Sequence, residues 1–262
     1  IPFIILLTVV VFVHEYGHYY FAKKYGVGVT DFSIGFGKEI FGFNDKSGTR
    51  WKFCVVPLGG YVKFFGDRNV FSQAEQEELL KRYDKKDQQK LFVTKPLYQR
   101  SLIVLAGPAA NFLLAILIFT FIYMFAGKDF TPAQINEVQI NSPAQSAGIK
   151  SGDLIVSIND KKVSSILEVS AFINTSSTEN IKIKVLRNDN KIDFLVTPEL
   201  IKSEDSLGNK INKKIIGIKI SPLNNELKRE RLGPATAIFY AVKETWFVTN
   251  ASFDFVISLF KG

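Results

Sequence analysis

The chain has 262 residues, of which 47% are hydrophobic, and it carries a formal net charge of +8 at pH 7. This length would accommodate one or two soluble domains, but the apolar residues gather in two long blocks that are typical of membrane spans. No nucleic-acid-binding motif accompanies the positive charge, which favours anionic lipid over nucleic acid as its counterpart, and the single cysteine, Cys54, excludes an intrachain disulfide.

The first predicted element is a membrane span over residues 1–22, with a His-Glu-x-x-His motif in its last third. His14 and His18 are just over one helical turn apart, so both side chains can reach one metal ion. Glu15 would lie beside that ion, where a carboxylate can take a proton from water. Ionisable residues are costly in an apolar helix, and these are the only two histidines of the chain. We therefore interpret the motif as a Zn²⁺ site with Glu15 as the catalytic base.

Residues 23–101 are predicted to form a cytoplasmic segment, because positive charges border both of its ends. Strand-like runs on either side of the turn Asn44–Gly48 indicate a β-hairpin. The apolar stretch Pro57–Phe65, which contains two glycines, has two interpretations. It is either part of an ordinary small sheet or a β-loop beside the metal whose free edge could pair with an unwound substrate. The charged run Ser72–Lys95 predicts an exposed helix without chemistry.

Residues 102–126 are the second predicted span, because no charged residue interrupts them and they are long enough to cross a hydrocarbon core of ~30 Å. The following residues, 127–222, are then placed on the periplasmic side. Within them, Ser142–Ile155 resembles the S-P-A-x-x-A-G-x-x-x-G-D-x-I string of bacterial PDZ domains. PDZ domains bind peptides by strand addition.

Short strands and turns are expected throughout this PDZ-like region. The predicted strands are Ile135–Ile140, Leu154–Ile158, Ile181–Leu186, Ile192–Val196 and Ile215–Ile220, with a helix at Leu167–Ile173 and a polar linker at Lys202–Asn212. In the last segment, 223–262, a helix is expected over Pro234–Phe260. Polar residues interrupt its apolar pattern, which favours a helix in the membrane interface over a true span.

Taken in this order, the features resemble the site-2 protease family of intramembrane zinc metalloproteases, in particular its bacterial regulator-of-sigma-E members. The likeness rests on the His-Glu-x-x-His motif, on Gly35-Phe36-Gly37 and Gly59-Gly60-Tyr61-Val62-Lys63, on the Ala-Gly-Pro-x-x-Asn run from Ala106 to Asn111, and on the PDZ-like string. It implies a polytopic α-helical protein of the bacterial inner membrane, with a membrane-associated β-hairpin or β-loop and an inserted PDZ domain of α+β type.

The resemblance also implies the chemistry and the partners. Zinc would be bound by His14 and His18 with Glu15 activating water, and the substrates would be single-span membrane proteins such as anti-sigma factors or signal-peptide remnants. The PDZ domain would admit only substrates already trimmed by another protease. Carried over residue by residue, the substrate-handling loop comprises Gly59, Gly60, Tyr61, Val62 and Lys63, and the structural motif near the site comprises Gly107, Pro108 and Asn111.

Two features depart from the family pattern. The third metal ligand of the family is the Asp of a Leu-Asp-Gly motif, which does not occur here, and Asp254 lacks that context. Catalytic zinc sites use three protein ligands, so we expect the third ligand beyond Gly262 and an incomplete site within these residues. The sigma-E regulators also carry two tandem PDZ domains, whereas one is recognisable here.

Two other functions remain open from the sequence. A soluble-type metalloprotease tethered to the membrane would need another ligand after the motif, and Glu39 is the only glutamate between the motif and Glu75. A membrane-anchored PDZ adaptor with an inactive metal site is the second alternative.

Overall fold

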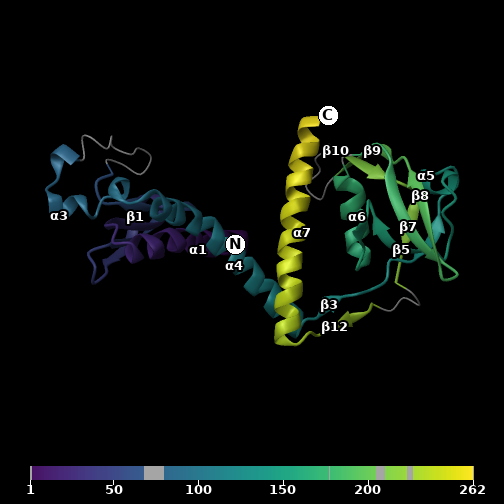
Figure 1. The fold of residues 1–262 in the computed structure, drawn as a ribbon, viewed down its shortest axis with the longest axis horizontal. Coiled ribbons are helices and arrows are strands. Elements are labelled where there is room, and N and C mark those ends of the chain that lie inside the picture. The colour runs from purple at the N-terminus through teal and green to yellow at the C-terminus, as the bar shows by residue number, and fades with distance from the viewer. Residues whose placement is uncertain (1, 68–79, 177, 205–209, 223–226, 262) are drawn as a thin grey trace. The chain divides into compact units, whose positions relative to one another are not determined.

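The computed structural model describes all residues except 1, 68–79, 177, 205–209, 223–226 and 262 (Figure 1). The chain divides into two compact units, Ile1–Leu117 and Ile118–Gly262, and the boundary falls inside helix α4. The first unit contains α1 (Pro2–Lys24), β1 (Val29–Asn44), β2 (Arg50–Phe64), the short helix α3 (Lys85–Gln88), a 3-10 turn (Phe92–Thr94) and most of α4 (Leu97–Phe125).

Two of the described helices, α1 and α4, are long and apolar enough to cross a membrane by length and composition. α4 begins five residues before the predicted boundary of the second span, at Leu97. The carbonyl of Pro96 accepts hydrogen bonds from the backbone N–H groups of Gln99 and Arg100, which continues the helix into polar sequence. Hydropathy marks where the apolar residues begin, whereas the helix begins at its first hydrogen bond.

β1 and β2 form the antiparallel hairpin that was predicted around the Asn44–Gly48 turn. The pairing is more extensive than one hairpin, because both strands bend. Residues 31–34 pair with residues 50–53 on one side and with residues 60–63 on the other. The segment 60–63 is therefore an edge, and no other described strand pairs with its outer side.

Aromatic side chains join this sheet to α1. Phe32 is fully buried, its ring stacks on Trp51 with centroids 4.1 Å apart, and it meets Phe12 of α1 edge-on at 5.8 Å. Tyr19 of α1 contacts both Phe32 and Trp51. Aromatic contacts of this kind add to the hydrophobic stabilisation that burial supplies. The sheet therefore lies along the half of α1 that carries the histidine motif.

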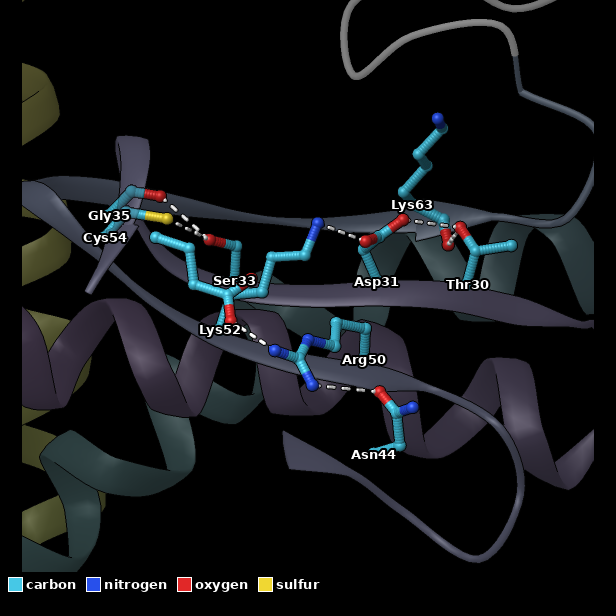
Figure 2. A network of polar contacts seen from close by, with 10 residues as sticks. Thr30, Asp31, Ser33, Gly35, Asn44, Arg50, Lys52, Cys54 and Lys63 are labelled. Atoms are coloured by element: carbon cyan, nitrogen blue, oxygen red, sulfur yellow. Dashed lines mark hydrogen bonds and ion pairs between the residues drawn. The ribbon is translucent and has the colours of Figure 1, made fainter. Parts of the chain in front are cut away.

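Polar contacts hold the bent strands together, as Figure 2 shows. Asp31 forms an ion pair with Lys52 on the neighbouring strand and accepts a hydrogen bond of 2.9 Å from the hydroxyl of Thr30. Burial alone would raise the pKa of Asp31, but the bonds from Lys52 and Thr30 bring it below its ordinary value. The Ser33 hydroxyl donates to the carbonyl of Gly35 at 3.0 Å. These partly and fully buried polar groups are thus paired within the sheet.

The charged run Ser72–Lys95 lies partly outside the described residues, including Glu75, Glu77 and Glu78. Its described part contains α3, whose first turn is capped by the carboxylate of Asp84 accepting from the N–H of Asp87. Leu91 is fully buried near its end. The segment is therefore not wholly a solvated surface, because one of its residues packs against Phe65 and Tyr83.

The second unit has a four-stranded sheet of order β6-β5-β7-β8, and Figure 1 labels β5, β7 and β8 of this sheet. Its elements are β3 (Lys128–Asp129), β4 (Ile135–Val138), α5 (Pro143–Ser146), β5 (Leu154–Ile158), β6 (Lys161–Lys162), α6 (Ile166–Thr175), β7 (Ile181–Arg187), β8 (Asn190–Val196), β9 (Glu199–Glu204), β10 (Lys210–Ile215), β11 (Ile218–Ile220), β12 (Arg229–Glu230) and α7 (Pro234–Lys261). Four predicted strands of the PDZ-like region, Ile135–Ile140, Leu154–Ile158, Ile181–Leu186 and Ile192–Val196, are confirmed to within two residues at each end. Its core is largely aliphatic and includes Ile135, Ile158, Ile181 and Ile183.

The predicted polar linker at Lys202–Asn212 is wrong at both of its ends, which are strands, and residues 205–209 between them lie outside the described residues. β9 and β10 pair antiparallel, with Lys213 opposite Ile201 and Ile215 opposite Glu199. Composition suggested a linker because polar and charged residues dominate, but a two-stranded ribbon exposes much of its surface and tolerates them. The predicted strand Ile215–Ile220 is also divided, because Gly217 has a positive φ of 75° that ends one strand and precedes the next.

Helix α7 has two apolar faces. Ala237 and Ala241 are completely buried, and Phe247 meets Phe172 of α6 edge-on with ring centroids 5.3 Å apart. On the remaining surface, Phe239 and Trp246 are 55% and 70% exposed. α7 is not among the candidate spans. The helix is therefore packed against the PDZ-like region on one face, which its sequence pattern did not predict.

Candidate metal centre

The two motif histidines face each other on α1. Their Nε2 atoms lie 3.2 Å apart, and the ring planes are inclined by 80°. The i,i+4 spacing on a regular helix produces this approach, as the sequence predicted. At this separation the Nε2–H of one ring can donate to Nε2 of the other, and when neither nitrogen carries a proton both lone pairs can be directed at one cation.

Helix α4 supplies a polar partner to the far side of each histidine. Nδ1 of His18 is 2.8 Å from the backbone carbonyl of Ile103, and Nδ1 of His14 is 3.2 Å from the amide Nδ2 of Asn111. A histidine that binds a metal through one nitrogen commonly uses the other in a hydrogen bond that fixes its orientation. The structure thus brings together a motif in the first predicted span and a residue that the sequence assigned to a structural motif in the second.

Glycines allow the two helices to approach this closely. A Cβ built on Gly107 would lie 2.9 Å from Nε2 of His14 and closer still to Nε2 of His18. A Cβ on Gly17 would collide with the backbone of Ala106 and lie 3.0 Å from the Cβ of Ala110. Small residues at a helix crossing are the usual means of close packing between membrane helices. Gly107 therefore provides the space into which both imidazoles point.

Glu15 lies beside the edge of the sheet. A Cβ on Gly60 would be 3.0 Å from Cγ of Glu15 and 2.8 Å from Cγ1 of Val11. The edge segment 60–63 therefore runs against the same turn of α1 that carries the motif. The structure brings Gly60 to the site, whereas Gly59 has a φ of 126° and faces the ring of Phe36.

The remaining candidates occupy other positions. Pro108 lies within α4, one residue after Gly107. Tyr61 stacks near Phe36 with centroids 6.2 Å apart, while Val62 packs with the buried cluster around Ile103. Lys63 accepts a hydrogen bond from Thr30 through its backbone carbonyl. These four residues shape the surroundings and do not touch the histidines in any contact described above.

The donor set fits two of the three protein ligands of a catalytic zinc site. Two imidazoles and one adjacent carboxylate match the first two ligands and the base of a catalytic zinc site, and the orphaned, buried Oδ1 of Asn111 marks a polar environment around them. Among the described residues no group of three or more His, Cys, Asp or Glu side chains is arranged to hold a metal. A third ligand is therefore not provided by the part of the chain that the structure shows.

Two acidic residues considered in the sequence have other partners. Glu39 accepts a hydrogen bond of 2.5 Å from Arg50, and Asp254 lies 3.4 Å from Nζ of Lys161. Both are engaged in ion pairs on strands or helices other than α1. Neither arrangement supports the alternative of a soluble-type site completed by Glu39.

Sequence reasoning missed two contributors to this centre. Ile103 acts through its backbone carbonyl, which no side-chain motif reveals. Gly17 lies inside the motif at one of its variable positions, and only the close approach of the Ala106 backbone on α4 shows its role. A search for small residues at helix crossings could have identified Gly17 but not Ile103.

The chain has clear relatives among known proteins. The family model of "Peptidase family M50" matches residues 2–262. The chain belongs to peptidase family M50. A protein of Mesorhizobium japonicum named "putative zinc metalloprotease" is 40% identical over 98% of this chain and 70% of its own length. A similarly named protein of Agrobacterium fabrum is 37% identical over 100% of this chain and 69% of its own length.

Further similarities are more distant. "Metalloprotease MmpA" of Caulobacter vibrioides is 33% identical over 94% of this chain and 63% of its own length. A solved PDZ domain of an SdrC-like protein from Listeria monocytogenes is 22% identical over 35% of this chain and 88% of that chain, with a TM-score of 0.28. The M50 relatives are thus matched along nearly all of this chain, and they extend beyond it.

Proposed function

We propose that this M50 chain is the main part of an intramembrane zinc endopeptidase that cleaves the membrane segments of single-span proteins. The observation that carries the proposal is the placement of the His14–His18 pair and Glu15 on a helix able to span a membrane, directly beside a sheet edge. A hydrolytic centre in such a helix acts on substrates that reach it within the membrane.

His14 and His18 would hold the zinc ion together with a third ligand that the described residues do not supply. Zinc bound there would supply a Lewis acid that polarises a peptide carbonyl and favours ionisation of water. Glu15 accepts the proton of the attacking water and returns it to the leaving amine. The partners of the two histidines on α4 keep both rings directed at one point.

The edge segment 60–63 is the proposed substrate-holding surface. A helical substrate offers no free backbone groups, so a peptide bond must be unwound before it can be cut. An extended segment that adds to a sheet edge recovers its hydrogen bonds from the edge strand. Because Gly60 lies against Glu15, a substrate paired along this edge would pass close to the catalytic base.

The PDZ-like region and the topology complete the proposal. Residues 23–101 lie in the cytoplasm, and the PDZ-like region lies on the periplasmic face of the inner membrane, in accordance with the distribution of positive charge. There it restricts access to substrates whose outer domain has been removed, such as anti-sigma factors or signal-peptide remnants. α7 then lies at the membrane interface with its exposed aromatic face.

The test is cleavage of a fluorescent single-span substrate by the full-length protein in proteoliposomes. We expect Glu15→Gln to lower the rate by about 10²–10⁴-fold, because general-base catalysis is lost while the zinc ligands remain. Tyr16→Phe is the matched control, since Tyr16 is 43% exposed on the same turn.

An equal rate for wild type and Glu15→Gln would refute the catalytic assignment. If the wild-type protein binds zinc but cuts no membrane substrate, the adaptor function gains support. That alternative predicts retained peptide binding by the PDZ-like region in both variants.

A further inference from the structure

The amide of Asn111 has an unusual environment. Its Nδ2 lies 3.2 Å from Nδ1 of His14, while its Oδ1 is buried without a hydrogen-bond partner among the described residues. A buried amide oxygen without a donor is less stable than one that is paired. The orientation of this amide therefore has consequences for the histidine beside it.

An amide nitrogen can only donate a hydrogen bond. If Nδ2 donates to Nδ1 of His14, the proton of the neutral imidazole must be on Nε2, from which it is donated to Nε2 of His18 when no metal is bound. A protonated ring nitrogen has no lone pair with which to bind a metal. In this orientation His14 is unable to serve as a zinc ligand.

His18 shows the opposite and productive arrangement. Its Nδ1 is 2.8 Å from the carbonyl of Ile103, and a carbonyl only accepts. The proton is therefore held on Nδ1, and Nε2 keeps its lone pair. A metal shared by both rings requires the same tautomer at His14.

We propose that Asn111 is the positioning residue of His14, with its Oδ1 accepting a hydrogen bond from the Nδ1–H of that ring. A half-turn of the amide exchanges Oδ1 and Nδ2 without moving any other group. It gives Oδ1 a donor and leaves Nε2 of His14 free to bind a metal, while Nδ2 takes the buried position at which Oδ1 had no partner. The tautomer of His14 decides between the two orientations of the Asn111 amide. Both histidines can bind one metal only when His14 carries its proton on Nδ1, and Oδ1 of Asn111 must then face that nitrogen. The inference rests on the proposed zinc site.

The geometry makes Asn111 suited to this task. Ile103, Gly107 and Asn111 recur every four residues on α4, so they lie along one side of the helix. The carbonyl of Ile103 fixes one ring, the side chain of Asn111 fixes the other, and Gly107 leaves room between them. Removal of such a partner lowers metal affinity by about 10–100-fold in other proteins.

The first experiment measures zinc affinity of the full-length protein in detergent by competition with a chromophoric chelator. We expect Asn111→Ala to weaken zinc binding by about 10–100-fold. Asn111→Asp should bind within about threefold of wild type, because a carboxylate offers two acceptors and cannot donate. Asn250→Ala is the control, since Asn250 is an exposed helical asparagine bonded to its own helix.

The result that would overturn the inference is an Asn111→Asp variant that is folded and loses zinc as severely as Asn111→Ala. That outcome would mean that the amide donates to His14 or serves only packing. A wild-type protein that binds no zinc would instead contradict the proposed function itself, so the two failures are distinguishable.

The second experiment does not depend on the Asp variant. Selective ¹⁵N-histidine labelling of the zinc-loaded full-length protein reports which ring nitrogen carries the proton. We expect the Nδ1–H tautomer at His14 in wild type and a mixture of tautomers in Asn111→Ala. A wild-type His14 protonated on Nε2 contradicts the proposed hydrogen bond.

Discussion

Gly107 is the residue on which the space between the two histidines most directly depends. Gly107→Ala would place a methyl group within 2.9 Å of Nε2 of His14, so one or both rings must move. Overpacking of this kind typically amounts to about 1–3 kcal/mol, and we expect zinc affinity to fall by about 5–150-fold. The measurement is chelator competition on the full-length protein.

The control for this change is Gly233→Ala, because a Cβ at Gly233 meets nothing within 4 Å. Its zinc affinity should equal that of wild type. Unchanged zinc binding by Gly107→Ala would show that α4 is not held against the histidines as described.

At the scale of elements, a buried cluster fastens α7 to the end of α4. Nζ of Lys128 lies 2.8 Å from Oε2 of Glu244, and the hydroxyl of Tyr123 donates to the same oxygen at 2.8 Å. Lys128 is almost fully buried, whereas Glu244 is about one-fifth exposed. The cluster therefore depends on both charges being present, because a buried charge without its partner is strongly unfavourable.

We expect Lys128→Met to loosen α7. The uncompensated carboxylate should reduce the free energy of local unfolding by about 2–4 kcal/mol, with some relief from its partial exposure. Hydrogen exchange of the α7 backbone amides would report this as faster exchange. Lys161→Met is the matched control, since the ion pair of Lys161 with Asp254 is about half exposed and should contribute little.

The turn between β1 and β2 is fastened to α1 by one carboxylate. Asp45 accepts hydrogen bonds from the hydroxyl of Tyr19 at 2.6 Å, the indole of Trp51 at 3.2 Å and two backbone N–H groups of its own turn. Burial opposes the charge, but these donors hold the pKa of Asp45 below its usual range. A lowered folded pKa means that the stabilisation is present above the unfolded pKa and is lost as the pH falls through the folded value.

Asp45→Ala should free the turn from α1. With Trp246→Phe as the background, Trp51 is the only tryptophan of this chain, and its fluorescence should become more accessible to a soluble quencher. The loss of a charged acceptor predicts about 1–3 kcal/mol of destabilisation. Asp87→Ala should leave the quenching unchanged, because Asp87 pairs with the half-exposed Lys90.

The elements also show where sequence patterns succeed. Long apolar helices and alternating strands were predicted closely, because the spacing of apolar residues along a short stretch of sequence indicates the type of element. The doubling of β1 and β2 was not predicted, since strand bends that let residues 31–34 pair on both sides depend on glycines whose effect is set by distant partners. The burial of one face of α7 was missed for the same reason, because polar interruptions such as Glu244 point into a site formed by Lys128 and Tyr123.

For the whole molecule, the approach of His14 to His18 was predictable because their spacing is local. The partners on α4 lie 85 and 97 residues away along the chain, at Ile103 and Asn111. Asn111 contacts His14 through its side chain, whereas Ile103 contacts His18 through its backbone carbonyl, so a sequence motif could not have predicted both contacts. The third ligand could not be located at all among the described residues.

The proposed topology makes a prediction for the whole molecule. In a Cys54→Ser background, Lys191→Cys in the PDZ-like region should react with an impermeant maleimide added to spheroplasts. Lys86→Cys should react only after the membrane is permeabilised, because residues 23–101 are placed in the cytoplasm. Both lysines are exposed, so neither is shielded by the fold. Labelling of both sites in intact spheroplasts contradicts the topology.

The regular recurrence of Ile103, Gly107 and Asn111 on α4 has a mechanical consequence. A slip of α4 past α1 by a single residue would displace the helix by about 1.5 Å and turn it by about 100°. The carbonyl, the space and the amide would all leave the histidines together, since they share one side of the helix. The contacts of the two histidines with α4 therefore require one particular register of the two helices, and a shift by one residue would break all of them.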